Sequence, residues 1–84
     1  MIMSKSDEVL MLIQEECAEV IQAISKVRRF GAEKNMEDLC KEIGDVEYLL
    51  SLAKIHVKGI TDFDYAEHRN AKFHKLRQYS NLFN

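Results

Sequence analysis

The sequence predicts an all-α protein, with an antiparallel helical hairpin followed by a C-terminal helix, assembling into an oligomeric four-helix-type bundle. Apolar residues recur with the 3.6-residue period of helices along most of the chain. The chain contains no proline and only three glycines, at positions 31, 44 and 59, so residues that break helices are few. Short β-branched runs between turn residues, which would indicate strands, are scarce.

The first helix is predicted over Ser6–Arg29. Asp7 and Glu8 suit the positive N-terminal end of the helix dipole, basic residues occupy its last turn, and Gly31 ends it. A projection at about 100° per residue gathers its apolar side chains into one broad stripe. The stripe contains Val9, Leu10, Ile13, Cys17, Val20, Ile21, Ile24 and Val27.

The second helix is predicted to begin after Asn35, a favourable N-cap, and to end at Lys58 with Gly59 as the residue beyond the cap. Asp38 projects inward, but its place in the first turn of this predicted helix is explained by capping. The apolar stripe of this helix contains Leu39, Ile43, Val46, Leu50, Ala53 and Val57.

The third helix is predicted to begin near Asp62 or Asp64 and to end at about Tyr79. Asp64 and Glu67 resemble a capping box, and no acidic residue follows from His68 onwards. Because the connections between the predicted helices are short, neighbouring helices should run antiparallel.

Length and composition restrict the class of protein. Eighty-four residues, 46% hydrophobic and 31% charged, form a single domain over residues 1–84 whose core is thin, so an oligomer is expected. The net charge of −2 disfavours nucleic-acid binding. The longest apolar run is too short to span a membrane, and no signal peptide is visible. Cys17 and Cys40 form no Cys-x-x-Cys motif, which fits a reducing cytoplasm.

Two acidic pairs interrupt the apolar stripes. Glu16 and Glu19 lie on the first helix, and Glu42 and Asp45 lie on the second, each pair three residues apart. That spacing places both carboxylates of a pair on one side of a turn, and antiparallel packing lets the two pairs meet. Four carboxylates in a partly desolvated site repel one another, so they bind either protons or a cation. The cation that suits oxygen ligands is Mg²⁺ or Mn²⁺.

Other readings of these residues stay open. A single Glu-x-x-Glu is usually a solvated face, and ion pairs with Arg69 or Lys72 are the main structural alternative to a metal. Arg69 lies within the apolar stripe of the third helix and needs an anionic partner, either a carboxylate of the acidic pairs or a bound phosphate. Asn70 can donate to a phosphate or a base. Gly44, inside the second pair, indicates close approach of a ligand or a helix, or tight helix packing.

The acidic motifs are Glu15-Glu16-Cys-Ala-Glu19 and Lys41-Glu42-Ile-Gly-Asp45-Val46. This pattern, E-x-x-E followed after a spacer by E-x-x-D, resembles that of the MazG-like all-α nucleoside triphosphate pyrophosphohydrolases. Residues 70–77 also resemble the basic helix that closes members of that family. The resemblance covers nearly the whole chain.

The resemblance implies an enzyme that cleaves (d)NTP to (d)NMP and pyrophosphate. It implies that Mg²⁺ is held by Glu16, Glu19, Glu42 and Asp45. Glu16 or Glu19 would accept the proton of the attacking water. The predicted substrate-binding residues are Lys54, Arg69, Asn70 and Lys72. Members of the family are generally oligomeric, which implies a homodimer or homotetramer.

An alternative function is that of a non-catalytic helical oligomerisation or interaction module, in which the acidic pairs form salt bridges to the third helix. Binding of nucleic acid by the basic tail is a third reading, disfavoured by the net charge.

Overall fold

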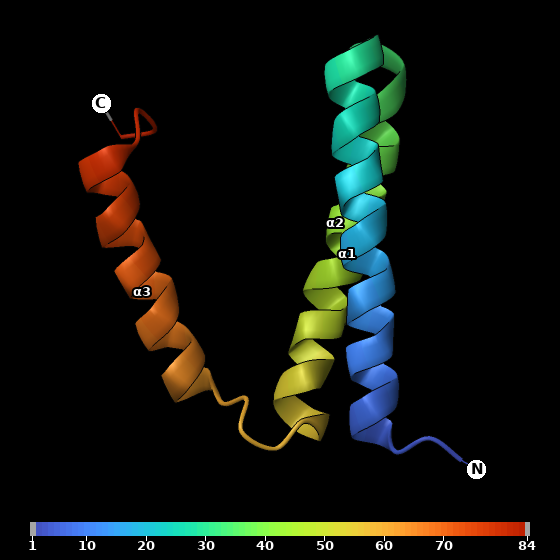
Figure 1. The fold of residues 1–84 in the computed structure, drawn as a ribbon, viewed down its shortest axis with the longest axis vertical. Coiled ribbons are helices and arrows are strands. Elements are labelled where there is room, and N and C mark those ends of the chain that lie inside the picture. Colours follow the sequence, from blue (N-terminus) through green and yellow to red (C-terminus); the bar gives the residue numbers. More distant parts are fainter. Residues whose placement is uncertain (1, 84) are drawn as a thin grey trace.

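The computed structural model describes residues 2–83 and contains three α-helices, with no strand in that range (Figure 1). They are α1 (Lys5–Phe30), α2 (Ala32–His56) and α3 (Asp62–Tyr79). The predicted all-α class and the helical hairpin are confirmed. None of the helices in the described chain is long and apolar enough to cross a membrane.

One residue, Gly31, separates α1 from α2. Its φ of 97° and ψ of 158° lie in a region that residues with a side chain rarely adopt, and its N–H donates to the carbonyl of Val27 at 2.9 Å. The chain therefore reverses within a single residue, and α1 and α2 pack along their length as an antiparallel pair (Figure 1).

The predicted start of the second helix after Asn35 is wrong. The helix begins at Ala32, and the Asn35 side chain donates its Nδ2 to the carbonyl of Gly31 at 2.9 Å. The N-cap residue is Gly31, which has no side chain to cap the helix, and the Asn35 side chain bonds to it from inside the first turn. Asp38 consequently lies in the second turn, and the predicted explanation of its inward projection by capping does not hold.

The predicted capping box of the third helix is also wrong. Thr61 is the N-cap, since its hydroxyl oxygen accepts from the backbone N–H of Asp64 at 3.3 Å and its hydroxyl donates to the Asp64 carboxylate at 2.9 Å. The second helix ends at His56 rather than at Lys58. The predicted end of the third helix at Tyr79 is confirmed.

The single chain buries very little. Only Val9, Ala23 and Ala53 are buried among the described residues. The chain measures 42 × 32 × 14 Å along its principal axes, and α3 diverges from the hairpin after the turn at residues 57–61 (Figure 1). A four-helix arrangement is therefore not formed within one chain, and the oligomeric bundle stays a prediction.

Candidate metal centre

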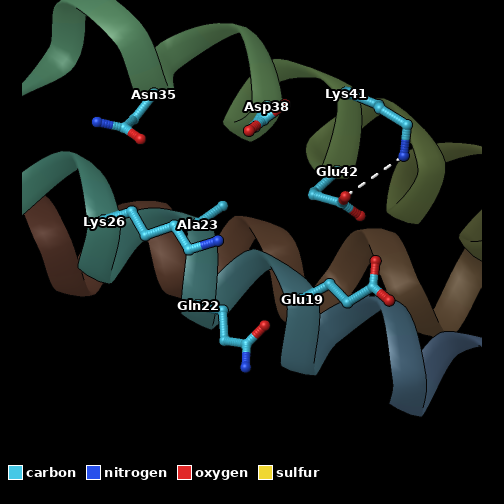
Figure 2. Close-up of a pocket in the computed structure, with 8 residues that line it drawn as sticks. All are labelled: Glu19, Gln22, Ala23, Lys26, Asn35, Asp38, Lys41 and Glu42. Carbon is cyan, nitrogen blue, oxygen red and sulfur yellow. Dashed lines mark hydrogen bonds and ion pairs between the residues drawn. The ribbon is translucent and has the colours of Figure 1, made fainter.

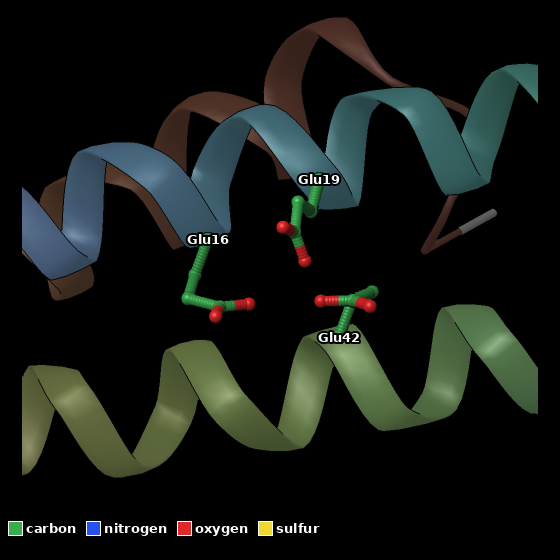
Figure 3. Close-up of side chains that lie close together, drawn as sticks. All are labelled: Glu16, Glu19 and Glu42. Atoms are coloured by element: carbon green, nitrogen blue, oxygen red, sulfur yellow. The ribbon is translucent and has the colours of Figure 1, made fainter.

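Three carboxylates from the two packed helices converge in the groove between them. Glu16 and Glu19 are successive on one side of α1, and Glu42 faces them from α2 (Figure 3). One ligand oxygen from each lies within 4.8 Å of the others. The i,i+3 spacing on α1 and the antiparallel reversal at Gly31 together produce this arrangement.

The groove shields part of this cluster from solvent. Glu16 and Glu42 are half-buried, whereas Glu19 is exposed. Oε2 of Glu16 and Oε2 of Glu42 are each covered without a hydrogen-bond donor among the described residues. Buried acceptors without a partner are unfavourable, so these two oxygens require a proton or a cation.

The pKa values of the three carboxylates shift in directions that agree with this requirement. The pKa of Glu16 is raised to about 7, first because its protonated carboxyl can donate to Glu42, and then by burial and by the charge of Glu19. The pKa of Glu19 is raised too, chiefly by Glu42. The pKa of Glu42 is lowered because it accepts from both and lies beside Lys41. The carboxylates therefore share a proton when no cation is bound.

The ammonium group of Lys41, which lies on α2 itself, contacts the cluster at Glu42. Its Nζ lies 3.4 Å from Oε1 of Glu42 and 3.5 Å from Oδ2 of Asp45. These carboxylates raise the pKa of Lys41. Asp45 lies outside the group of three, so its predicted role as fourth ligand stays a prediction.

A polar pocket of about 240 Å³ adjoins the cluster and extends toward the hairpin tip (Figure 2). Both helices line it. The lining residues are Glu19, Gln22, Ala23 and Lys26 from α1, and Asn35, Asp38, Lys41 and Glu42 from α2. Sequence reasoning did not single out this pocket, although the spacing of residues 19, 22, 23 and 26 continues one face of α1.

A comparison with models of protein families identifies the family of the chain. The MazG nucleotide pyrophosphohydrolase domain matches residues 5–81, a range that contains all three helices and both acidic pairs. This chain belongs to the MazG family. Neither a curated protein nor a solved structure matches it. MazG domains act on nucleotides and generally depend on a divalent metal.

The cluster in this MazG domain fits such a metal. Ionised carboxylates are pure acceptors, which hard cations such as Mg²⁺ and Mn²⁺ prefer as ligands. Two of the oxygens are buried without a donor, and three side chains already converge without an intervening basic group from α3. The predicted salt bridges from Arg69 or Lys72 to the cluster are absent among residues 2–83.

The predicted substrate-binding residues of the MazG domain lie elsewhere in the single chain. Lys54 forms an ion pair with Asp62 at 2.9 Å, and its Nζ lies 4.7 Å from the centre of the Tyr65 ring. The guanidinium of Arg69 lies 5.8 Å from the same ring. The sequence analysis did not single out Tyr65, although its i,i+4 spacing from Arg69 places the two side chains on one face of the helix.

The remaining predicted contacts, Asn70 and Lys72, lie on α3, which diverges from the hairpin (Figure 1). Asn70 lines an open hollow on α3 itself, together with Phe63 and Phe73. The substrate-binding roles of these α3 residues therefore stay predictions.

No other helix comes close to Gly44 in the single chain, and the predicted approach of a ligand stays a prediction. A Cβ built on this residue meets no described atom within 4 Å apart from its own helix backbone and its chain neighbours. Neither tight packing within the hairpin nor close contact with the other helix requires glycine here.

Proposed function

We propose that this MazG domain is a Mg²⁺-dependent nucleotide pyrophosphohydrolase that converts (d)NTP and water to (d)NMP and pyrophosphate. The observation that carries the proposal is the convergence of Glu16, Glu19 and Glu42 within 4.8 Å, with two of their oxygens buried and unpartnered. Family membership over residues 5–81 supports the same reaction class.

Each acidic residue has a proposed role. Glu16, Glu19 and Glu42 hold the ion, with Asp45 joining them from the next turn of α2 once Lys41 moves aside. Bound Mg²⁺, or Mn²⁺ in its place, would screen the triphosphate charge and polarise a phosphoryl oxygen.

Glu16 or Glu19 accepts the proton of the attacking water. The water oxygen forms a bond to the α-phosphorus while the bond from that phosphorus to the bridging oxygen breaks, and pyrophosphate leaves with the electron pair. Glu19 is the solvent-exposed member of the cluster, which supports its contact with water.

We propose that the chain works as a homodimer or homotetramer. Lys54 of α2, and Arg69 and Lys72 of α3, are the proposed cations that neutralise the leaving pyrophosphate, and Asn70 of α3 can donate a hydrogen bond to it. The α3 residues can do so only if an α3 helix comes closer to an acidic cluster than it does within one chain. A neighbouring subunit can supply that helix. The many large apolar side chains that the single chain exposes support such an assembly.

The proposal is tested by incubating the protein with a panel of (d)NTPs and Mg²⁺ and measuring pyrophosphate and orthophosphate separately. Glu19→Ala and Asp45→Ala should each lose activity while circular dichroism shows an intact fold. Glu15→Ala is the matched control, because Glu15 is an exposed neighbour outside the cluster. Unaltered turnover in more thermostable Glu19→Ala and Asp45→Ala variants would exclude the metal site, and orthophosphate release would mean that a different bond is cut.

A non-catalytic oligomerisation or interaction module is the second candidate, and the exposed apolar surface favours it. In its predicted form, with acidic pairs bound to the third helix, it is not supported, because Lys41 of α2 is the cation at the cluster. The module predicts assembly without pyrophosphate release, and the same assay separates the two candidates.

A further inference from the structure

The pocket beside the acidic cluster has a size and position that suit one part of a nucleotide. Its volume of about 240 Å³ can hold a nucleobase but not a whole nucleoside triphosphate. Glu19 and Glu42 form one end of its lining, and Lys26 and Asn35 lie toward the hairpin tip (Figure 2). Seven residues of α1 separate Glu19 from Lys26, a rise of about 10 Å at ~1.5 Å per residue. That distance is comparable with the length of a nucleoside from its α-phosphate to the far edge of its base.

The α2 wall of the pocket presents hydrogen-bond acceptors. Asn35 uses its Nδ2 to donate to the carbonyl of Gly31, and its amide oxygen lies on the side of Asp38 (Figure 2). The carboxylate of Asp38 can only accept when it is ionised. Two acceptors from successive turns of α2 therefore line the same stretch of the pocket.

The charges of the pocket disfavour a phosphate at this place. Asp38 adds a negative charge to this stretch of the pocket, and it lies outside the cluster of Glu16, Glu19 and Glu42 that would hold the ion. A phosphate offers only acceptors and negative charge, so the Asp38 carboxylate and the Asn35 oxygen would both repel it, and Lys26 is the donor that lines this end of the pocket. A neutral group with N–H donors matches the wall, and nucleobases carry such groups on exocyclic amino nitrogens.

We propose that this pocket binds the base of the substrate and that Asp38 and Asn35 accept hydrogen bonds from its amino group. The domain then prefers nucleotides with an amino-bearing base (cytosine, adenine or guanine) to those with uracil or thymine. This inference rests on the proposed function, because it places the triphosphate on the adjoining acidic cluster.

CTP and UTP provide the sharpest comparison, since at position 4 of the ring CTP carries an amino group and UTP a carbonyl oxygen. The carbonyl would face two acceptors. We expect kcat/KM for CTP to exceed that for UTP by about tenfold, the lower range for a carboxylate that reads a base edge, because the pocket is partly open to solvent. Asp38→Asn introduces a donor, so the preference should fall below about twofold while Mn²⁺ binding at the cluster is retained.

Glu37→Gln is the matched control. It removes the same charge from the neighbouring residue, which is exposed and lies outside the pocket, and it should leave the CTP/UTP ratio unchanged. Equal kcat/KM for CTP and UTP in the wild-type protein, with pyrophosphate released from both, would overturn the base pocket and leave the proposed function standing. A preference that survives Asp38→Asn would overturn it as well.

Absence of pyrophosphate release from every nucleotide would overturn the proposed function instead. The pocket is then tested by binding alone, with CMP and UMP titrated into ¹⁵N-labelled protein. Shifts of the Asn35 and Asp38 amide resonances at lower concentration for CMP than for UMP support the inference. Equal shifts with both nucleotides, or none with either, contradict it.

Discussion

The carboxyl groups of Glu16 and Glu42 face each other across the groove between α1 and α2, and each has its Oε2 buried without a donor among residues 2–83. Two ionised carboxylates in this position repel each other and lack hydrogen bonds. The metal-free protein therefore carries a local destabilisation at the proposed metal site. Either removal of one of the two carboxylate charges or binding of a cation should relieve this destabilisation.

Glu42→Gln should raise the thermal stability of the metal-free protein by a few degrees and weaken Mn²⁺ binding by at least about tenfold. The amide can donate to Glu16, which removes both the repulsion and the unpartnered acceptor. Differential scanning fluorimetry with EDTA and calorimetric titration with Mn²⁺ measure the two effects. Glu47→Gln, on the exposed face of α2, should change neither quantity. A Glu42→Gln protein that melts earlier and binds Mn²⁺ normally would show that Glu42 is structural.

The metal-free protein should lose stability as the pH rises from about 5 to 8. The folded-state pKa of Glu16 is about 7, above its ordinary value of 4.5, so its contribution is fully present below that ordinary value and is lost through pH 7. Glu19 shifts in the same direction. The lowered pKa of Glu42 acts oppositely, but the cluster as a whole takes up a proton on folding.

Urea denaturation in EDTA across this pH range measures the effect, and Glu16→Gln should flatten the profile. Saturating Mn²⁺ should reverse it, because the ion replaces the shared proton and binds more tightly as the pH rises. A profile that is the same with and without Mn²⁺ would show that no ion enters the cluster.

Periodicity identified the helices correctly, and the acidic pairs could be located because Glu16 and Glu42 interrupt apolar stripes at helical spacing. The convergence of carboxylates from both helices follows from the reversal at Gly31. Helix starts were less predictable, since Asn35 and Asp64 both looked like caps. The chain instead uses a glycine reversal and the hydroxyl of Thr61.

The position of α3 could not be predicted from the sequence. Arg69 in an apolar stripe indicated an anionic partner, but periodicity does not say whether that partner belongs to the same chain. In the structure Arg69 and Lys54 both lie over the ring of Tyr65. The pocket was missed for a different reason. The inward position of Asp38 was explained by capping of the helix, so Asp38 was not considered as a binding residue.

The two glycines of the hairpin should respond oppositely to alanine. Gly31 has a φ of 97°, so Gly31→Ala should lower the free energy of unfolding by about 1–3 kcal/mol. Gly44 lies in the middle of α2 with open space at its Cβ position, so Gly44→Ala should raise it by about 0.5–1 kcal/mol. Urea denaturation of both variants gives the comparison. Destabilisation by Gly44→Ala at concentrations where the protein is oligomeric would reveal a neighbouring subunit close to that residue.

The proposed oligomer should form through the face of the hairpin opposite the acidic pocket. At about 100° per residue, exposed apolar residues gather on one side of both helices, and Glu19 and Asp38 lie on the other. The apolar face contains Leu10, Cys17, Ile21 and Ile24 on α1, and Met36, Cys40 and Ile43 on α2. Ile21, which is 69% exposed, lies within that face.

A charge at Ile21 should therefore separate the subunits, because an unpaired carboxylate cannot be buried in an apolar contact without a large loss of hydration. Ile21→Glu should sediment as a monomer at micromolar concentration, where the wild-type protein sediments as a dimer or tetramer. Ile2→Glu introduces the same change at a residue that precedes α1 and is 97% exposed, and it should leave the assembly intact. If α3 of a neighbour contributes phosphate contacts, Ile21→Glu should also lose pyrophosphohydrolase turnover while its hairpin still binds Mn²⁺. A monomeric, stable wild-type protein with full turnover would contradict both the interface and the shared site.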